Sequence, residues 1–205
     1  MINLKENSKV LFQGDSVTDC YRDRLDESSL GNSYVREVAS YLKKYNIKTI
    51  NKAIAGNRVD HLLQRFESDF KNVNPDYIFL LIGVNDTWHN YPNQKDNKTF
   101  ETEYNLLLSK IKNEIDVPVI ILEPFIIGYN EEITCMNSDL NQKIDIIRKL
   151  SNKYNYQYIS FKEDFDNIVT KENYLNFTLE GIHLHDEGYK VISDKLISNI
   201  NIITK

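Results

Sequence analysis

The stretch "DYIFLLIG", at residues 76–83, is an almost unbroken run of apolar and aromatic residues. A strand that is apolar on both faces is typical of a parallel sheet with helices packed on both sides. Similar runs occur before and after it, at 9–13, 48–54, 117–125 and 156–161. Their recurrence predicts a sheet whose neighbouring strands run in the same direction.

Segments with apolar residues at helical spacing separate these runs. They lie at 32–45, 58–70, 100–115, 138–154 and 186–200. Strands that alternate with helices form right-handed crossovers, so we predict an α/β protein built as a three-layer α/β/α sandwich. No internal repeat, low-complexity tract or Pro/Gly-rich linker interrupts the pattern, and residues 1–205 are therefore expected to form a single domain.

The composition excludes several classes of partner. The net charge of −5 argues against a protein that binds nucleic acid or an anionic membrane, since both need a concentrated positive surface. Cys20 and Cys135 are too few to cross-link a domain of this size and are expected to be reduced thiols. No apolar run approaches the roughly 18 residues of a membrane span, and residues 1–12 lack the apolar core of a secretory signal. We therefore expect a cytoplasmic protein.

Polar clusters follow several of the predicted strands directly. They are Gly14-Asp15-Ser16, Ala55-Gly56-Asn57 and Gly83-Val84-Asn85-Asp86. Open α/β sheets bind their ligands at the carboxyl ends of the strands, so these clusters mark the predicted site. Ser16 then has two interpretations, because it either caps the helix that follows the strand or acts as a nucleophile.

A serine nucleophile needs a base within hydrogen-bond reach and a third group that orients the base. His183 lies in the polar segment "EGIHLHDEG", residues 180–188, before the last predicted helix. Glu180 precedes it by one turn, and a carboxylate at that offset can reach the ring Nδ1 while Nε2 points outward. Ser16, His183 and Glu180 are therefore the candidate catalytic residues.

Acyl transfer also needs hydrogen-bond donors aimed at the developing oxyanion. Gly56 and Asn85 each follow a strand on the same predicted sheet edge as Ser16. They could supply a backbone N–H and a side-chain amide, although glycine and asparagine are also ordinary turn residues.

The blocks "GDSVTD", "NKAIAGNRV", "IGVNDTW" and "EGIHLHDEGY" resemble, in this order and spacing, those of the SGNH (GDSL-type) hydrolase family. The resemblance extends over almost the whole chain. It implies a flavodoxin-like sheet of five parallel strands, with Ser16 as nucleophile and His183 as base. It also implies an oxyanion hole formed by the Ser16 amide, the Gly56 amide and the Asn85 side chain.

Within the family, "GVNDTW" and "LEPF" resemble the bacterial carbohydrate-esterase-like members that remove small acyl groups. The resemblance therefore implies a small-molecule acyl ester as substrate, an acetyl ester above all, with no cofactor and no metal. Trp88, His89 and Tyr91 follow Asn85 and are candidates for lining the substrate pocket, since aromatic rims suit sugars as well as a core. The sequence leaves the ester and the oligomeric state open.

The last block departs from the family pattern, which usually reads Asp-x-x-His followed by Pro. Here it reads Glu180-Gly181-Ile182-His183-Leu184. Glutamate is one methylene longer, so its bond to His183 needs a different backbone path or rotamer. Hydrolases with a glutamate as third member occur. Without that bond, backbone groups or water would have to orient the ring.

Other functions compete with this interpretation. A metal-dependent phosphoesterase could use His183 and His185 of "HLH" together with Asp15, Asp86 and His89, but the chain has only four histidines. A non-catalytic, carbohydrate-binding relative of the same fold is a further alternative. A nucleotide or flavin binder is disfavoured, because no Gly-rich phosphate loop follows the first strand.

Overall fold

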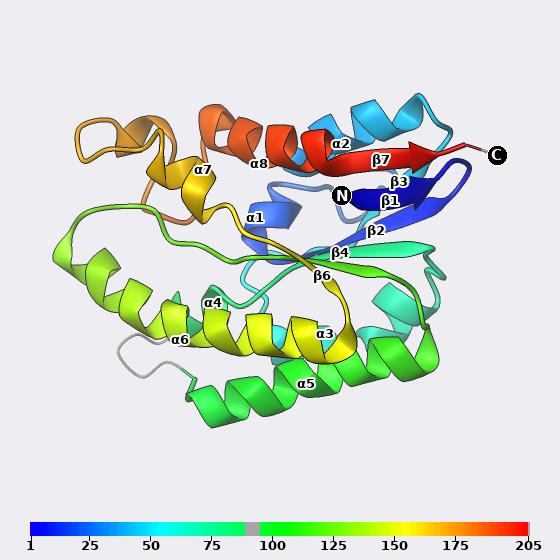
Figure 1. The fold of residues 1–205 in the computed structure, drawn as a ribbon, viewed down its shortest axis with the longest axis horizontal. Coiled ribbons are helices and arrows are strands. Elements are labelled where there is room, and N and C mark those ends of the chain that lie inside the picture. Colours follow the sequence, from blue (N-terminus) through cyan, green and yellow to red (C-terminus); the bar gives the residue numbers. More distant parts are fainter. Residues whose placement is uncertain (89–94, 205) are drawn as a thin grey trace.

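The central element of the structure is a parallel sheet of five strands in the order β3-β2-β4-β5-β6 (Figure 1). The computed structural model describes residues 1–88 and 95–204. Each strand coincides with one of the predicted hydrophobic runs, and all except β2 are shorter than their run. The strands are β2 (Lys9–Gly14), β3 (Lys48–Asn51), β4 (Tyr77–Leu81), β5 (Val119–Leu122) and β6 (Gln157–Ile159).

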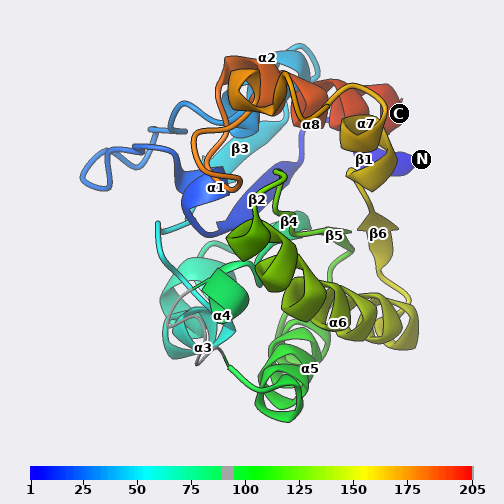
Figure 2. The same cartoon turned by 90° about the vertical axis from the view of Figure 1, so that its left-hand side faces the viewer.

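Helices cover both faces of this sheet, which confirms the predicted sandwich (Figure 2). Phe12 and Phe79 point to one face, where their rings stack at 4.7 Å. That face is covered by α2 (Tyr34–Lys43), α7 (Lys162–Asp166) and α8 (Asp186–Asn199). The opposite face, with Leu11 and Ile78, packs against α3 (Val59–Gln64), α5 (Asn97–Glu114) and the C-terminal half of α6 (Glu131–Tyr154). Because both faces are covered, every residue of β4 is buried.

Two helical segments differ from the prediction. The helix predicted at 138–154 begins at Glu131, because Asn130 caps it by accepting a 2.8 Å hydrogen bond from the Ile133 N–H. Ile133 and Met136 continue its buried stripe among polar residues that hid the pattern. The segment 58–70 divides into α3 and a π-helical turn, Glu67–Lys71.

A second, two-stranded sheet was not predicted. It pairs β1 (Ile2–Lys5) in parallel with β7 (Ile200–Ile203), so that Ile2 lies opposite Ile200. Each strand has only four residues, and the pairing joins the two ends of the described chain, where local patterning carries little signal. Four further short elements were also missed: α1 (Ser16–Asp19), α4 (Asn85–Trp88), α7 and the 3₁₀ turn Tyr174–Asn176.

The fold also bears on two expectations from composition. Both cysteines are free: Cys20 is half-buried and Cys135 is exposed. Across the described residues, no helix is both long enough and apolar enough to cross a bilayer.

Candidate active site

The candidate residues gather at the carboxyl ends of the central strands, on the side that faces the viewer in Figure 2. β2 lies between β3 and β4 in the sheet. Ser16 follows β2, the segment 52–58 follows β3, and α4 follows β4. Because the strands are parallel, the topology brings these three segments to one edge.

Ser16 is the first residue of α1, and the structure shows which residue caps that helix. Asp15 caps the helix, because its Oδ1 accepts a 3.0 Å hydrogen bond from the Val17 N–H. The capping role therefore belongs to Asp15, and the Ser16 hydroxyl is left for another partner. Its Oγ lies 2.9 Å from Nε2 of His183, although the two residues are 167 positions apart.

Glu180 contacts the other ring nitrogen of His183. Its Oε1 is hydrogen-bonded to Nδ1 and also accepts a 3.1 Å bond from the His183 backbone N–H. With Nδ1 donating to the carboxylate, Nε2 is left as an acceptor for the Ser16 hydroxyl. The structure thus places Ser16, His183 and Glu180 in one hydrogen-bonded line.

A closed turn holds this glutamate in place. The Thr178 Oγ1 accepts a 2.8 Å hydrogen bond from the Gly181 N–H and donates a 2.9 Å bond to the His183 carbonyl. Gly181 adopts φ = +102°, and a Cβ there would lie 2.8 Å from the Ile127 carbonyl oxygen. Only glycine suits this position. This turn fixes the backbone between Thr178 and His183, and no sequence signal had singled out Thr178.

The predicted oxyanion donors lie beside this line. The Asn85 side chain is 4% exposed, and its Nδ2 donates a 3.0 Å hydrogen bond to the Asn57 carbonyl, which leaves its second N–H available. Gly56 has φ = +79°, which favours glycine. Within the described part of the chain, the backbone N–H groups of Ser16 and Gly56 make no hydrogen bond. The structure therefore leaves all three predicted donors free to bind.

Comparison with known proteins identifies the family of the chain. Residues 12–191 match the model of the GDSL-like lipase/acylhydrolase family, a span that includes Ser16, Gly56, Asn85 and His183. The chain belongs to this family. It is accordingly a serine ester hydrolase.

Individual relatives match over nearly their whole length. An acetylxylan esterase from Geobacillus stearothermophilus is 26% identical over 212 residues, spanning 97% of this chain and 96% of the esterase. A GDSL-like protein from Parabacteroides merdae has a solved structure with a TM-score of 0.86 at 30% identity, covering 96% of this chain and 97% of that one. A variant of a Geobacillus stearothermophilus acetyl xylan esterase gives a TM-score of 0.85 at 24% identity over 95% of each chain, a similarity of fold.

The predicted pocket residues of this GDSL-like hydrolase are placed only in part. Trp88 ends α4, is half-buried and packs against the core. His89 and Tyr91 lie outside the described residues. A hollow of about 410 Å³ borders the site, lined by Cys20 and Tyr21 after α1 and by Leu184 and His185 after His183.

A larger cleft, of about 520 Å³, does not belong to this site. It lies between residues 123–129, α6 and α7, and its lining contains no predicted catalytic or oxyanion residue. The larger of these two cavities therefore does not coincide with the hydrogen-bonded candidate residues. We assign the site by its hydrogen-bonded groups, since volume alone carries no reactivity.

One acidic cluster of this GDSL-like hydrolase includes Asp86, which directly follows Asn85. Among the described residues, Asp60, Asp86 and Glu103 form the one set of three side chains close enough to share a metal ion. The Lys95 ammonium occupies that position, because its Nζ lies 2.9, 3.1 and 2.6 Å from their oxygens. Of the ligands that the phosphoesterase interpretation named, Asp86 belongs to this set, whereas His183 and His185 do not.

Asp15, which directly precedes Ser16, is fully buried. Burial raises the pKa of its carboxyl from 3.8 to about 7, and the nearby Asp86 acts in the same direction. Among the described residues, its Oδ2 finds no hydrogen-bond partner. Burial likewise raises the pKa of Asp86 to about 6, although Lys95 opposes the shift. The Asp15 carboxyl therefore ionises near neutral pH.

This ionisation predicts a pH-dependent cost in stability. A carboxyl whose pKa is raised on folding stabilises the native state fully below its unfolded pKa, and this contribution is lost as the pH rises through the folded pKa, here between about 4 and 7. Asp15→Asn keeps an acceptor for Val17 and removes the buried charge. We expect it to raise the free energy of unfolding at pH 8 by on the order of 3 kcal/mol, with the gain vanishing towards pH 4.

Denaturant unfolding at several pH values measures this effect. Asp26→Asn is the matched control, because hydrogen bonds from Ser28 lower the pKa of exposed Asp26, and its loss should cost stability as the pH rises. An equal gain for Asp15→Asn at pH 5 and pH 8 would show that the native Asp15 does not titrate in this range.

Proposed function

We propose that this protein is a carbohydrate esterase that removes a small acyl group, acetyl, through a Ser16–His183–Glu180 triad. The observation that carries the proposal is the hydrogen-bonded line from Ser16 Oγ to His183 and on to Glu180. The nature of the substrate rests on the similarity to the Geobacillus stearothermophilus acetylxylan esterase, which extends over almost the full length of both chains.

The geometry supports a two-step acyl transfer. Ser16 Oγ attacks the ester carbonyl carbon while its proton passes to His183 Nε2, and Glu180 stabilises the imidazolium that results. The N–H groups of Ser16 and Gly56 and the Asn85 amide donate to the oxyanion. The bond to the sugar oxygen then breaks, and that oxygen takes the proton from Nε2. Water attacks the acyl-Ser16 ester in the same way and releases the acid.

Turnover of model esters tests the proposal. We expect the purified full chain to hydrolyse p-nitrophenyl acetate and acetylated xylo-oligosaccharides, and p-nitrophenyl octanoate far more slowly. EDTA should not reduce the rate, whereas an organophosphonate should abolish it and add one equivalent to Ser16 by mass spectrometry. Binding of an acetylated sugar without turnover would instead identify a non-catalytic relative, and inhibition by EDTA would identify a metal-dependent enzyme.

Loss of the Asn85 amide should act on the transition state. We expect Asn85→Ala to lower kcat by roughly 10²- to 10³-fold with little change in KM, because a preorganised donor binds the oxyanion more strongly than the substrate carbonyl. Steady-state kinetics on p-nitrophenyl acetate measure both constants. Asn201→Ala, which removes an exposed amide on β7, is the matched control. A large rise in KM with kcat intact would assign Asn85 to substrate binding only.

A further inference from the structure

We propose that Asp19 is a positioning residue for the oxyanion hole, which it serves by fixing the peptide segment that carries the Gly56 N–H. This inference rests on the proposed function. Asp19 ends α1, one turn after Ser16, and its Oδ2 accepts a 2.7 Å hydrogen bond from the Ala55 N–H. Ala55 directly precedes Gly56, so the carboxylate joins the nucleophile's helix to the predicted oxyanion donor.

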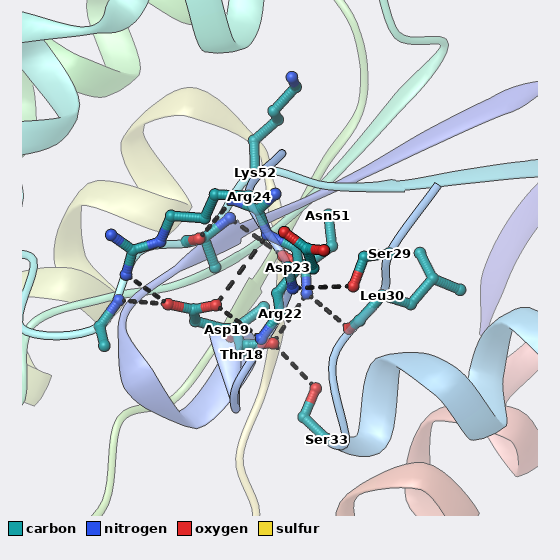
Figure 3. A network of polar contacts seen from close by, with 12 residues as sticks. Thr18, Asp19, Arg22, Asp23, Arg24, Ser29, Leu30, Ser33, Asn51 and Lys52 are labelled. Atoms are coloured by element: carbon teal, nitrogen blue, oxygen red, sulfur yellow. Dashed lines mark hydrogen bonds and ion pairs between the residues drawn. The ribbon is translucent and has the colours of Figure 1, made fainter. Parts of the chain in front are cut away.

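The carboxylate of Asp19 is buried and paired. Its side chain is 4% exposed, and its Oδ2 also accepts a 2.9 Å bond from Arg24 Nη2 (Figure 3). The Arg22 backbone N–H donates to its Oδ1 at 3.2 Å. Burying a carboxylate costs free energy unless charged or polar partners compensate. Arg24 and Arg22 supply that compensation, and the charge strengthens the bond to the Ala55 N–H.

Other polar bonds tie the same two segments together (Figure 3). The side chain of Asn51 donates to the Thr18 carbonyl at 2.9 Å, while its Oδ1 accepts from the Ala53 N–H at 3.0 Å. Arg22 Nη2 donates to the Ala53 carbonyl at 3.1 Å. These bonds hold residues 51–53 against α1. The next bond along the chain is the one from the Ala55 N–H to Asp19, directly before Gly56.

The hydrogen bonds of the backbone N–H groups at residues 55–57 fit a positioning role for Asp19. The backbone N–H groups of Ala55 and Asn57 both donate hydrogen bonds within the protein. Ala55 donates to Asp19 Oδ2, and Asn57 donates to the Ile54 carbonyl. The Gly56 N–H between them makes no hydrogen bond within the described residues. A donor that must bind a transient oxyanion has to be unoccupied but rigidly held, since small misplacements cost large factors in rate.

Variants at both ends of this bond test the inference. We expect Asp19→Ala to lower kcat about 10- to 100-fold on p-nitrophenyl acetate with KM nearly unchanged, the same signature as Asn85→Ala. Asp19→Asn should recover most of the rate, because an amide oxygen can still accept from Ala55. Ala55→Pro deletes the donor while leaving Asp19 and its arginines intact, and it should reproduce the loss. If Asp19→Ala does not fold, the Ala55→Pro variant still tests the inference.

Two control variants separate this role from general stability. Arg24→Ala removes the half-exposed ion pair but leaves the Ala55 bond, and it should keep most of kcat. Asp23→Asn changes an exposed carboxylate of the same loop and should also be active. All variants are assayed well below their thermal midpoints, measured by circular dichroism.

The outcomes distinguish this inference from the proposed function. If the wild type hydrolyses the ester, Ser16→Ala does not, and folded Asp19→Ala or Ala55→Pro keeps full kcat, only the inference is overturned. A loss in Arg24→Ala equal to that in Asp19→Ala would also overturn it, as would a rise in KM alone. If Ser16→Ala is as active as the wild type, the proposed function fails and this inference with it.

Discussion

Replacing Ser16 with alanine is expected to lower kcat by about 10³-fold or more, because a triad without its nucleophile loses the acyl-enzyme route altogether. The exchange removes a half-exposed hydroxyl at the start of α1, where Asp15 rather than Ser16 caps the helix. We therefore expect the variant to fold normally. Steady-state kinetics on p-nitrophenyl acetate, with thermal unfolding as a check, measure both effects.

Cys20→Ala is the matched control for this prediction. Cys20 lies one turn after Ser16 and is half-buried beside the same site, so its thiol is a second candidate nucleophile near that edge. We expect the Cys20 variant to keep its activity and still to form the organophosphonate adduct. Wild-type turnover in Ser16→Ala would contradict the assignment of the nucleophile.

Glu180→Gln is expected to lower kcat by a large factor, up to about 10⁴ by analogy with the corresponding amide replacement in serine proteases. In the structure, Glu180 Oε1 accepts from both the Nδ1 and the backbone N–H of His183. A glutamine amide can present its NH₂ group to the ring and favour the wrong tautomer, and it carries no charge to stabilise the imidazolium. Activity across pH 5 to 9 measures the effect on kcat.

Variants at the neighbouring positions complete this test. His183→Gln should be at least as impaired, because the base itself is lost, and Glu180→Asp should keep part of the activity. Glu187→Gln, an exposed acid in the first turn of α8, is the control and should be fully active. Nearly full activity in Glu180→Gln, with none in His183→Gln, would reduce the site to a Ser-His dyad.

Much of the fold was predictable because its signals are local. A strand covered on both faces must be apolar throughout, as in "DYIFLLIG", and β4 is buried along its whole length. The start of α8 at Asp186 was likewise predictable, since acidic side chains in the first turn stabilise a helix. The pairing of β1 with β7 was not, because its stability comes from a contact between distant segments.

For the candidate site too, local sequence patterns predicted one part, and contacts between distant segments decided the rest. The sequence by itself determined which residues could react, since Gly-Asp-Ser after a strand and a histidine one turn after an acid are patterns within a few residues. Only the tertiary structure decided that Ser16 Oγ and His183 Nε2 lie 2.9 Å apart, and that the Thr178 turn brings the Glu180 carboxylate to His183 Nδ1. The Asp19–Ala55 bond likewise exists only once β2 and β3 are paired. Chemical identity is carried by each residue alone, whereas hydrogen-bond geometry depends on how separate segments pack.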